Sequence, residues 1–122
     1  MAMINLKSLM FEETKRPMVV YHGTDVRLRR FNLQKSTFGT IWFTSDKKKI
    51  LAGTAGASGR GYIVTAEVTI NNPAGWNEYE KLVIDQFEGM GYDGAILPDP
   101  DGHFDCFVLS LKQIKILNVE KV

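Results

Sequence analysis

Hydrophobic and polar residues alternate along several short stretches of the chain, which is the pattern of half-buried β-strands. The alternation is clearest over 62–71, where Val64 and Thr65 begin a regular exchange of apolar and polar positions. Other β-prone runs lie at 18–21, 40–44, 94–97, 104–109 and 114–119. The pattern therefore predicts roughly six strands, paired mainly in an antiparallel manner.

Helical periodicity is confined to two segments. One long helix is expected over 76–90, because apolar residues recur there at helical spacing: Trp76, Tyr79, Leu82, Val83, Phe87 and Met90. A short helix is expected over 47–52, with Ser45 or Asp46 as its N-cap. Together with the strands, these helices predict the α+β fold class.

The first 16 residues carry a weaker pattern than the rest of the chain. Residues 1–16 indicate a short docking helix or a loose N-terminal arm, which Pro17 ends. The remaining residues, 17–122, fit one domain of ordinary size. The N-terminal residues show no continuous apolar run followed by a cleavage site, so we expect no signal peptide.

Composition narrows the function classes only slightly. The chain has 122 residues, is 44% hydrophobic and carries a formal net charge of +1, so it lacks the basic excess of a general nucleic-acid coat. A single cysteine, Cys106, is typical of a protein from a reducing compartment. Its apolar neighbours favour a buried core thiol rather than a nucleophile. No apolar run reaches membrane-spanning length, so we expect no membrane association.

Three residues are candidates for chemistry. His22 ends an apolar run and precedes Gly23, so it is either a ligand-binding histidine at a strand mouth or a structural one. Trp42 lies in a β-prone run and is either core or an aromatic face for stacking. Asp105 opens a strand that is apolar on both sides, so it is either paired, reserved for a ligand or exposed at the edge.

Other candidates are weaker. The glycine-rich segment 53–61 lacks the spacing of a phosphate-binding loop and is expected to be a loop. His22, His103 and Asp105 lack metal-ligand spacing, so no metal is expected. The basic residues Arg27, Arg29, Arg30 and Lys47–Lys49 form either a solvated face or a docking surface.

Read together and in order, the three candidate sites resemble the motifs of the diphtheria-toxin-like ADP-ribosyltransferases, which include the poly(ADP-ribose) polymerases. The chain is most similar to small bacterial or phage-type members. The first motif is the strand ending in His-Gly at 19–24, and the second is the glycine and apolar-aromatic strand at 39–46. The third is the late strand at 105–109, followed by Gln-Ile at 113–114. Two departures stand out: Asp105 where the family usually has Glu, and Trp42 where it usually has Tyr.

The resemblance implies a split antiparallel β-sandwich of two small sheets with two or three helices, and NAD as co-substrate. It implies that His22, Trp42 and Asp105 are catalytic. His22 would bind a ribose of NAD, Trp42 would stack on nicotinamide, and Asp105 would accept a hydrogen bond from the 2′-OH of the nicotinamide ribose. NAD would be held by residues of the first two motifs: Tyr21, His22, Gly23, Thr24, Trp42, Phe43 and Ser45.

The function so implied is mono-ADP-ribosylation of a protein or nucleic-acid acceptor with release of nicotinamide. The alternatives are an NAD-glycohydrolase, in which water is the acceptor, and a non-catalytic module that keeps the fold for binding. We expect a monomer in the cytoplasm of a bacterium or of a phage-infected host.

Overall fold

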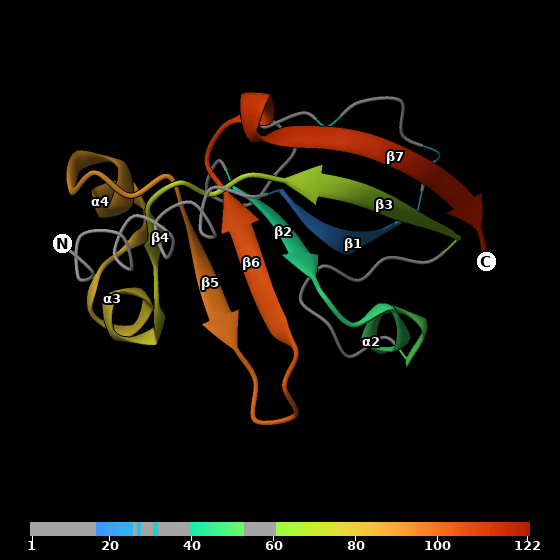
Figure 1. Ribbon diagram of the computed structural model, residues 1–122, viewed down its shortest axis with the longest axis horizontal. Helices are drawn as coiled ribbons and strands as arrows, with labels where there is room; N and C mark the ends of the chain where they lie inside the picture. The colour runs from blue at the N-terminus through green and yellow to red at the C-terminus, as the bar shows by residue number, and fades with distance from the viewer. Residues whose placement is uncertain (1–16, 26, 28–30, 32–39, 53–60) are drawn as a thin grey trace, which may run out of the picture.

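In the computed structural model, which describes residues 17–25, 27, 31, 40–52 and 61–122, the strands join into one mixed sheet (Figure 1). The strands are β1 (Met18–Thr24), β2 (Ile41–Thr44), β3 (Tyr62–Val68), β4 (Pro73–Ala74), β5 (Gly94–Pro98), β6 (Phe104–Val108) and β7 (Ile114–Lys121). Their order across the sheet is β4-β5-β6-β2-β1-β3-β7. All neighbours are antiparallel except β4 and β5, which are parallel. The expected α+β class and mainly antiparallel pairing are confirmed.

The sheet consists of two halves that meet between β1 and β2. Strands β4, β5, β6 and β2 form one half, and β1, β3 and β7 form the other. The halves are joined by a single residue pair, Tyr21 with Thr44, whereas β1 pairs with β3 over its whole length. The expectation of two separate sheets is corrected to this extent, because the one pair makes the hydrogen-bonded sheet continuous.

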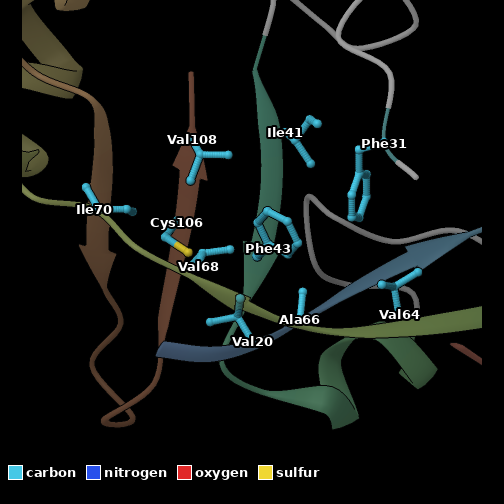
Figure 2. Close-up of a cluster of buried hydrophobic side chains, with 10 residues drawn as sticks. All are labelled: Val20, Phe31, Ile41, Phe43, Val64, Ala66, Val68, Ile70, Cys106 and Val108. Carbon is cyan, nitrogen blue, oxygen red and sulfur yellow. The ribbon is translucent and has the colours of Figure 1, made fainter. Parts of the chain in front are cut away.

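The main core lies between the two halves of the sheet (Figure 2). It combines Val20 and Val64 of the β1 half with Phe43 and Val108 of the β2 half, all of them buried. In Figure 2 the side chains of the two halves point toward one another across this core. The halves are therefore held together by apolar packing more than by hydrogen bonds between strands.

Three short helices accompany the sheet: α2 (Lys47–Ala52), α3 (Trp76–Lys81) and α4 (Ile84–Gly89), with a 3-10 turn, η3 (Leu111–Gln113). The helix α2 was expected, and its cap is Asp46, whose Oδ1 accepts a hydrogen bond from the backbone of Lys48 at 3.0 Å. No helix of the described residues is long and apolar enough to cross a membrane.

The single long helix expected over 76–90 is wrong. Leu82 and Val83 are extended, with ψ of 147° and 155°, and they separate α3 from α4. Each helix has its own cap: the side chain of Glu78 accepts from Gly75 N, and that of Gln86 accepts from Val83 N at 3.0 Å. The break lets one part of the apolar set reach a second core cluster and leaves the other part in solvent.

That second cluster is built on β5 and β6. Phe87 is fully buried in it, and Tyr79 and Leu82 pack against it. By contrast Val83 and Met90 are more than 60% exposed, although the sequence placed them on the same apolar helix face. A continuous helix could not give these neighbours such different environments.

Two further expectations differ from the structure. The strand expected to end at Tyr21 continues through Thr24, because all seven residues of β1 pair with β3. The two-residue strand β4 was not expected, and it pairs with the first residues of β5. The N-terminal arm at 1–16 and, except for Gly61, the loop at 53–61 lie outside the described residues.

Candidate functional site

The three motifs lie on three adjacent strands, in the order β6-β2-β1, at the junction of the two halves of the sheet. Thr44 of β2 is paired with Asp105 on one side and with Tyr21 on the other. Residues 23 to 84 positions apart in sequence thus form one row across the sheet. Since paired residues point to the same face, these three side chains belong to one face of the sheet.

Trp42 belongs to the same face as Asp105. It is paired with Phe107, two residues beyond Asp105 on β6, so Trp42 and Asp105 are diagonal neighbours. We call the surface that carries Trp42, Thr44, Asp105 and Phe107 the Trp42 face. The opposite face carries Phe43 and Cys106 and belongs to the main core.

Asp105 has an incompletely satisfied carboxylate. Its Oδ1 is buried and has no hydrogen-bond partner among the described residues. Burial raises the pKa of Asp105, and the hydroxyl of Thr44, acting as a hydrogen-bond donor, opposes this rise. A buried polar atom without a partner costs roughly 1–3 kcal/mol, so such an atom calls for an explanation, of which a role in binding or catalysis is one.

Trp42 is half-buried among aromatic rings. Its ring lies 4.8 Å from that of Phe107 and 5.8 Å from that of Tyr79, which it meets edge to face. Tyr79 in turn contacts Trp76 of the same helix, whose indole nitrogen donates to the carbonyl of Pro98 at 2.8 Å. The indole of Trp42 therefore packs on the second core cluster and keeps some exposed surface, and its role as a face for stacking stays a prediction.

We expected His22 at the end of a strand. It lies instead inside β1, where it is paired with Val64. Its ring lies 5.1 Å from Phe31 and 5.7 Å from Phe43, so it is on the side of the main core rather than on the Trp42 face. His22 is linked to Trp42 only through backbone, by a 2.7 Å hydrogen bond from Nδ1 to the Trp42 carbonyl oxygen. The structure does not gather all three side chains on one face.

The hydrogen bond of His22 fixes its chemistry. A carbonyl only accepts, so Nδ1 carries the proton and Nε2 is left as an acceptor in the neutral ring. Burial lowers the pKa of His22, and the bond to the Trp42 carbonyl only partly offsets this effect. At neutral pH His22 is thus an uncharged ring whose Nε2 suits a hydroxyl rather than an anion.

The remaining expected NAD-binding residues have mainly structural contacts. Tyr21 packs on Ile50 and Ile63, and Phe43 is fully buried in the main core. Gly23 and Thr24 continue the ladder with β3. Ser45 joins β2 to β6: its Oγ accepts from Phe104 N at 2.8 Å, and its own backbone N donates to Phe104 O at 2.9 Å.

Sequence reasoning missed a group of charged residues near Asp105. Lys49 of α2 forms an ion pair with Asp99, and its Nζ lies 3.5 Å from Asp101 in the turn between β5 and β6. The side-chain hydrogen bond to Asp99 is the main cause that raises the pKa of Lys49. No local signal could have shown this pair, because about 50 residues separate its members in sequence. Lys47 likewise forms an ion pair, with Glu120, so the basic run is largely neutralised where it is described.

Gln113, which belongs to the third motif, takes part in a structural network with Asp93. The carboxylate of Asp93 accepts from the backbone of Asn71 and Asn72, both at 2.9 Å. Gln113 donates to the carbonyls of Thr69 and Asp93 and accepts from the backbone of Ser110. These contacts join the ends of β3, β5 and β6, which explains their residue types without a ligand.

Metal and thiol chemistry find little support in the described part of the chain. No group of three or more His, Cys, Asp or Glu side chains there could hold a metal ion. Cys106 is buried in the main core, and this burial raises the pKa of its thiol to about 12. The expectation that Cys106 is a core residue is confirmed.

Comparison of the chain with models of protein families, with curated proteins and with solved structures finds no match. The function therefore has to be argued from the site and from the order of the motifs.

Proposed function

We propose that the chain is an NAD-dependent mono-ADP-ribosyltransferase with the split-sheet fold of the diphtheria-toxin-like family. The observation that carries this proposal is the buried, unpartnered Oδ1 of Asp105 on the same face as Trp42. A sheet joined by one residue pair, with the main core between its halves, is consistent with the split sandwich of that family.

The residues present fit NAD in their hydrogen-bonding character. Asp105 Oδ1 and His22 Nε2 are both acceptors, and the two riboses of NAD offer hydroxyl donors. Because His22 and the Trp42 face lie on different sides of the sheet junction, we assign them different parts of the ligand. Asp105 and Trp42 take the nicotinamide ribose and nicotinamide, and His22 takes the ribose of the adenosine half.

When bound, NAD supplies a glycosidic bond to nicotinamide whose cleavage develops positive charge at the anomeric carbon of ribose. The role of Asp105 is to accept a hydrogen bond from the 2′-OH and to stabilise this charge with its carboxylate. The electron pair of the broken bond leaves with nicotinamide. The nucleophile of the acceptor then forms the new bond to the anomeric carbon and loses its proton.

The proposal is tested by nicotinamide release from NAD, with an acceptor supplied as bacterial lysate. Asp105→Asn should lose roughly 100-fold or more in kcat with little change in KM, because the carboxylate acts on charge that develops in the transition state. Asp101→Asn is the matched control, since Asp101 is an exposed acid of the same hairpin. The control should keep the rate of the wild type.

Asp105→Glu tests the departure from the family. A rise in rate identifies the native Asp as a shorter version of the usual acid, and a fall shows that the backbone is adjusted to Asp. Label transferred from NAD to a macromolecule distinguishes a transferase from a glycohydrolase. If the folded wild-type protein releases no nicotinamide above background with lysate present, the transferase proposal is wrong and a non-catalytic binding module replaces it.

A further inference from the structure

Thr44 is a fully buried polar residue at the centre of the row that contains Asp105. It is 0% exposed, ends β2, and is paired directly with Asp105 on β6. Its Oγ1 accepts a hydrogen bond from the backbone N of Asp46 at 3.1 Å. Asp46 is the cap of α2, so Thr44 links the start of that helix to the row.

In the bond from Asp46 the oxygen of Thr44 is the acceptor, so the hydroxyl proton of Thr44 is still available to a second partner. A hydroxyl is both a donor and an acceptor, and here its acceptor side is used by Asp46 N. Since the residue is fully buried, its proton has to go to a protein acceptor. The carboxylate of Asp105 is such an acceptor on the neighbouring strand, and the Thr44 hydroxyl lowers the pKa of Asp105 accordingly.

Other groups act on the same carboxylate. Asp99 and Asp101, from the turn between β5 and β6, raise the pKa of Asp105, whereas Lys49 of α2 lowers it. Lys49 is already paired with both of these aspartates. Among the groups around Asp105, Thr44 is thus the neutral donor that favours the ionised form.

We infer that Thr44 is the positioning residue of the site: its hydroxyl holds one oxygen of Asp105 and leaves the buried Oδ1 free for a substrate hydroxyl. This inference rests on the proposed function only in giving Asp105 a substrate. The hydrogen bond itself is a property of the protein without ligand and is tested separately from activity.

The test is a carbon-13 NMR titration of the aspartate carboxyls, with the Asp105 signal assigned by its loss in Asp105→Asn. Thr44→Val keeps the size of the side chain and removes the hydroxyl, so it should raise the pKa of Asp105 above that of the wild type. Thr44→Ser restores the donor and should return the wild-type titration. Thr40→Val is the matched control, because it removes another buried hydroxyl that is not paired with Asp105.

A second measurement uses the wild-type protein and needs no variant. The Thr44 hydroxyl proton should be protected from exchange with water, and its resonance should shift as Asp105 titrates. A Thr44 hydroxyl that exchanges rapidly, or an Asp105 titration that is the same in folded Thr44→Val as in the wild type, overturns the inference.

Turnover separates this inference from the proposed function. If the wild type releases nicotinamide, Thr44→Val should lose roughly 10-fold in kcat, the size expected for one hydrogen bond to a charged group, with KM nearly unchanged. The pH profile of kcat in Thr44→Val should move to higher pH, because Asp105 then ionises at a higher pH. If the wild type is inactive while Thr44→Val still raises the pKa of Asp105, the proposed function fails and the role of Thr44 in holding the carboxylate remains.

Discussion

At the scale of single residues, the described polar groups near the sheet junction differ in how well they are satisfied. Ser45, Thr44 and Asp93 all have hydrogen-bond partners that join separate elements. Asp105 differs, because one buried oxygen of its carboxylate has no hydrogen-bond partner in the part of the chain that the structure describes. A residue that lowers the stability of the folded protein and makes no compensating contact is expected at a functional site.

Asp105→Asn should therefore stabilise the protein at neutral pH. Because burial raises the pKa of Asp105, the native state binds its proton more tightly than the unfolded chain does. Stability then falls as pH rises from the unfolded pKa of about 3.9 through the higher folded pKa, and the penalty is complete above the folded value. Asn has no charge and escapes this penalty.

The measurement is the melting temperature of the wild type and of Asp105→Asn as a function of pH. The variant should melt higher at pH 7, and the difference should vanish at about pH 3. Asp101→Asn serves as the control of opposite sign, because the pKa of Asp101 is lowered, chiefly by the backbone hydrogen bond from His103. A melting temperature that is lower in Asp105→Asn at pH 7 would show that the carboxylate is well solvated.

The roles of the two ring nitrogens of His22 can be tested separately. In His22→Asn the side-chain amide can still donate to the Trp42 carbonyl, as Nδ1 does, but the acceptor at Nε2 is lost. We expect this variant to lose at least 10-fold in affinity for NAD while it folds as the wild type does. His22→Ala should lose more stability than His22→Asn, because both variants remove the ring that packs on Phe31 and Phe43 but only His22→Ala also loses the hydrogen bond to the Trp42 carbonyl.

Calorimetry with NAD and thermal unfolding of both variants provide the measurements. Unchanged NAD affinity in folded His22→Asn would remove Nε2 from the site and leave His22 a structural residue.

At the scale of elements, the position of a short strand depends on how closely its backbone can approach that of its neighbours, as well as on its hydrophobic pattern. Gly94 starts β5 and lies between Pro73 of β4 and Val108 of β6. A Cβ at this position would lie 2.3 Å from the carbonyl oxygen of Phe107, a backbone atom that cannot turn away. The absence of a side chain at Gly94 is thus a condition for β5 to pair on both sides.

Gly94→Ala should destabilise the protein by about 3 kcal/mol or more, because the strand has to shift to relieve the overlap. Gly89→Ala is the matched control: no atom lies within 4 Å of its added Cβ, and it is the last residue of α4. The control should be neutral or gain up to roughly 1 kcal/mol. Urea unfolding of both variants gives the comparison, and equal stability of Gly94→Ala and the wild type would contradict the close approach.

At the scale of the whole molecule, the junction between the two halves of the sheet determines the geometry of the candidate site. The halves are joined by one residue pair, Tyr21 with Thr44, but they enclose the main core together. Hydrogen bonding alone would let them separate, whereas the buried apolar surface between them resists separation. The candidate site lies where the halves meet, so its geometry depends on their packing.

We expect the two halves to unfold in one cooperative step. Trp42 lies on β2, and Trp76 of α3 donates a hydrogen bond to Pro98 of β5, so both tryptophans report on the half that contains β2. Far-UV circular dichroism reports on both halves. Urea transitions followed by the two signals should coincide, because neither half keeps a complete core without the other. Earlier loss of the dichroism signal, or amides of β3 and β7 that exchange at a lower free energy than those of β6, would show that the β1 half opens independently.

The sequence by itself determined the elements with a regular local pattern. The alternation over 62–71, the capped helix at 47–52 and the buried Cys106 follow from near neighbours in the chain. The structure has the helix and the buried thiol as predicted, and the strand as β3, which ends at Val68. The sequence also led to Trp42 and Asp105, which lie on one face of adjacent strands. Local periodicity is sufficient for such features because burial of one face constrains every second residue of a strand.

Only the tertiary structure decided the remainder. It placed His22 inside β1 against Phe31 and Phe43, divided the expected helix at Leu82, and paired Lys49 with Asp99. It also brought Thr44 to Asp105. The contacts of His22, Lys49 and Thr44 depend on partners about ten to sixty residues away, and no local pattern encodes which distant partner completes a core or satisfies a charge.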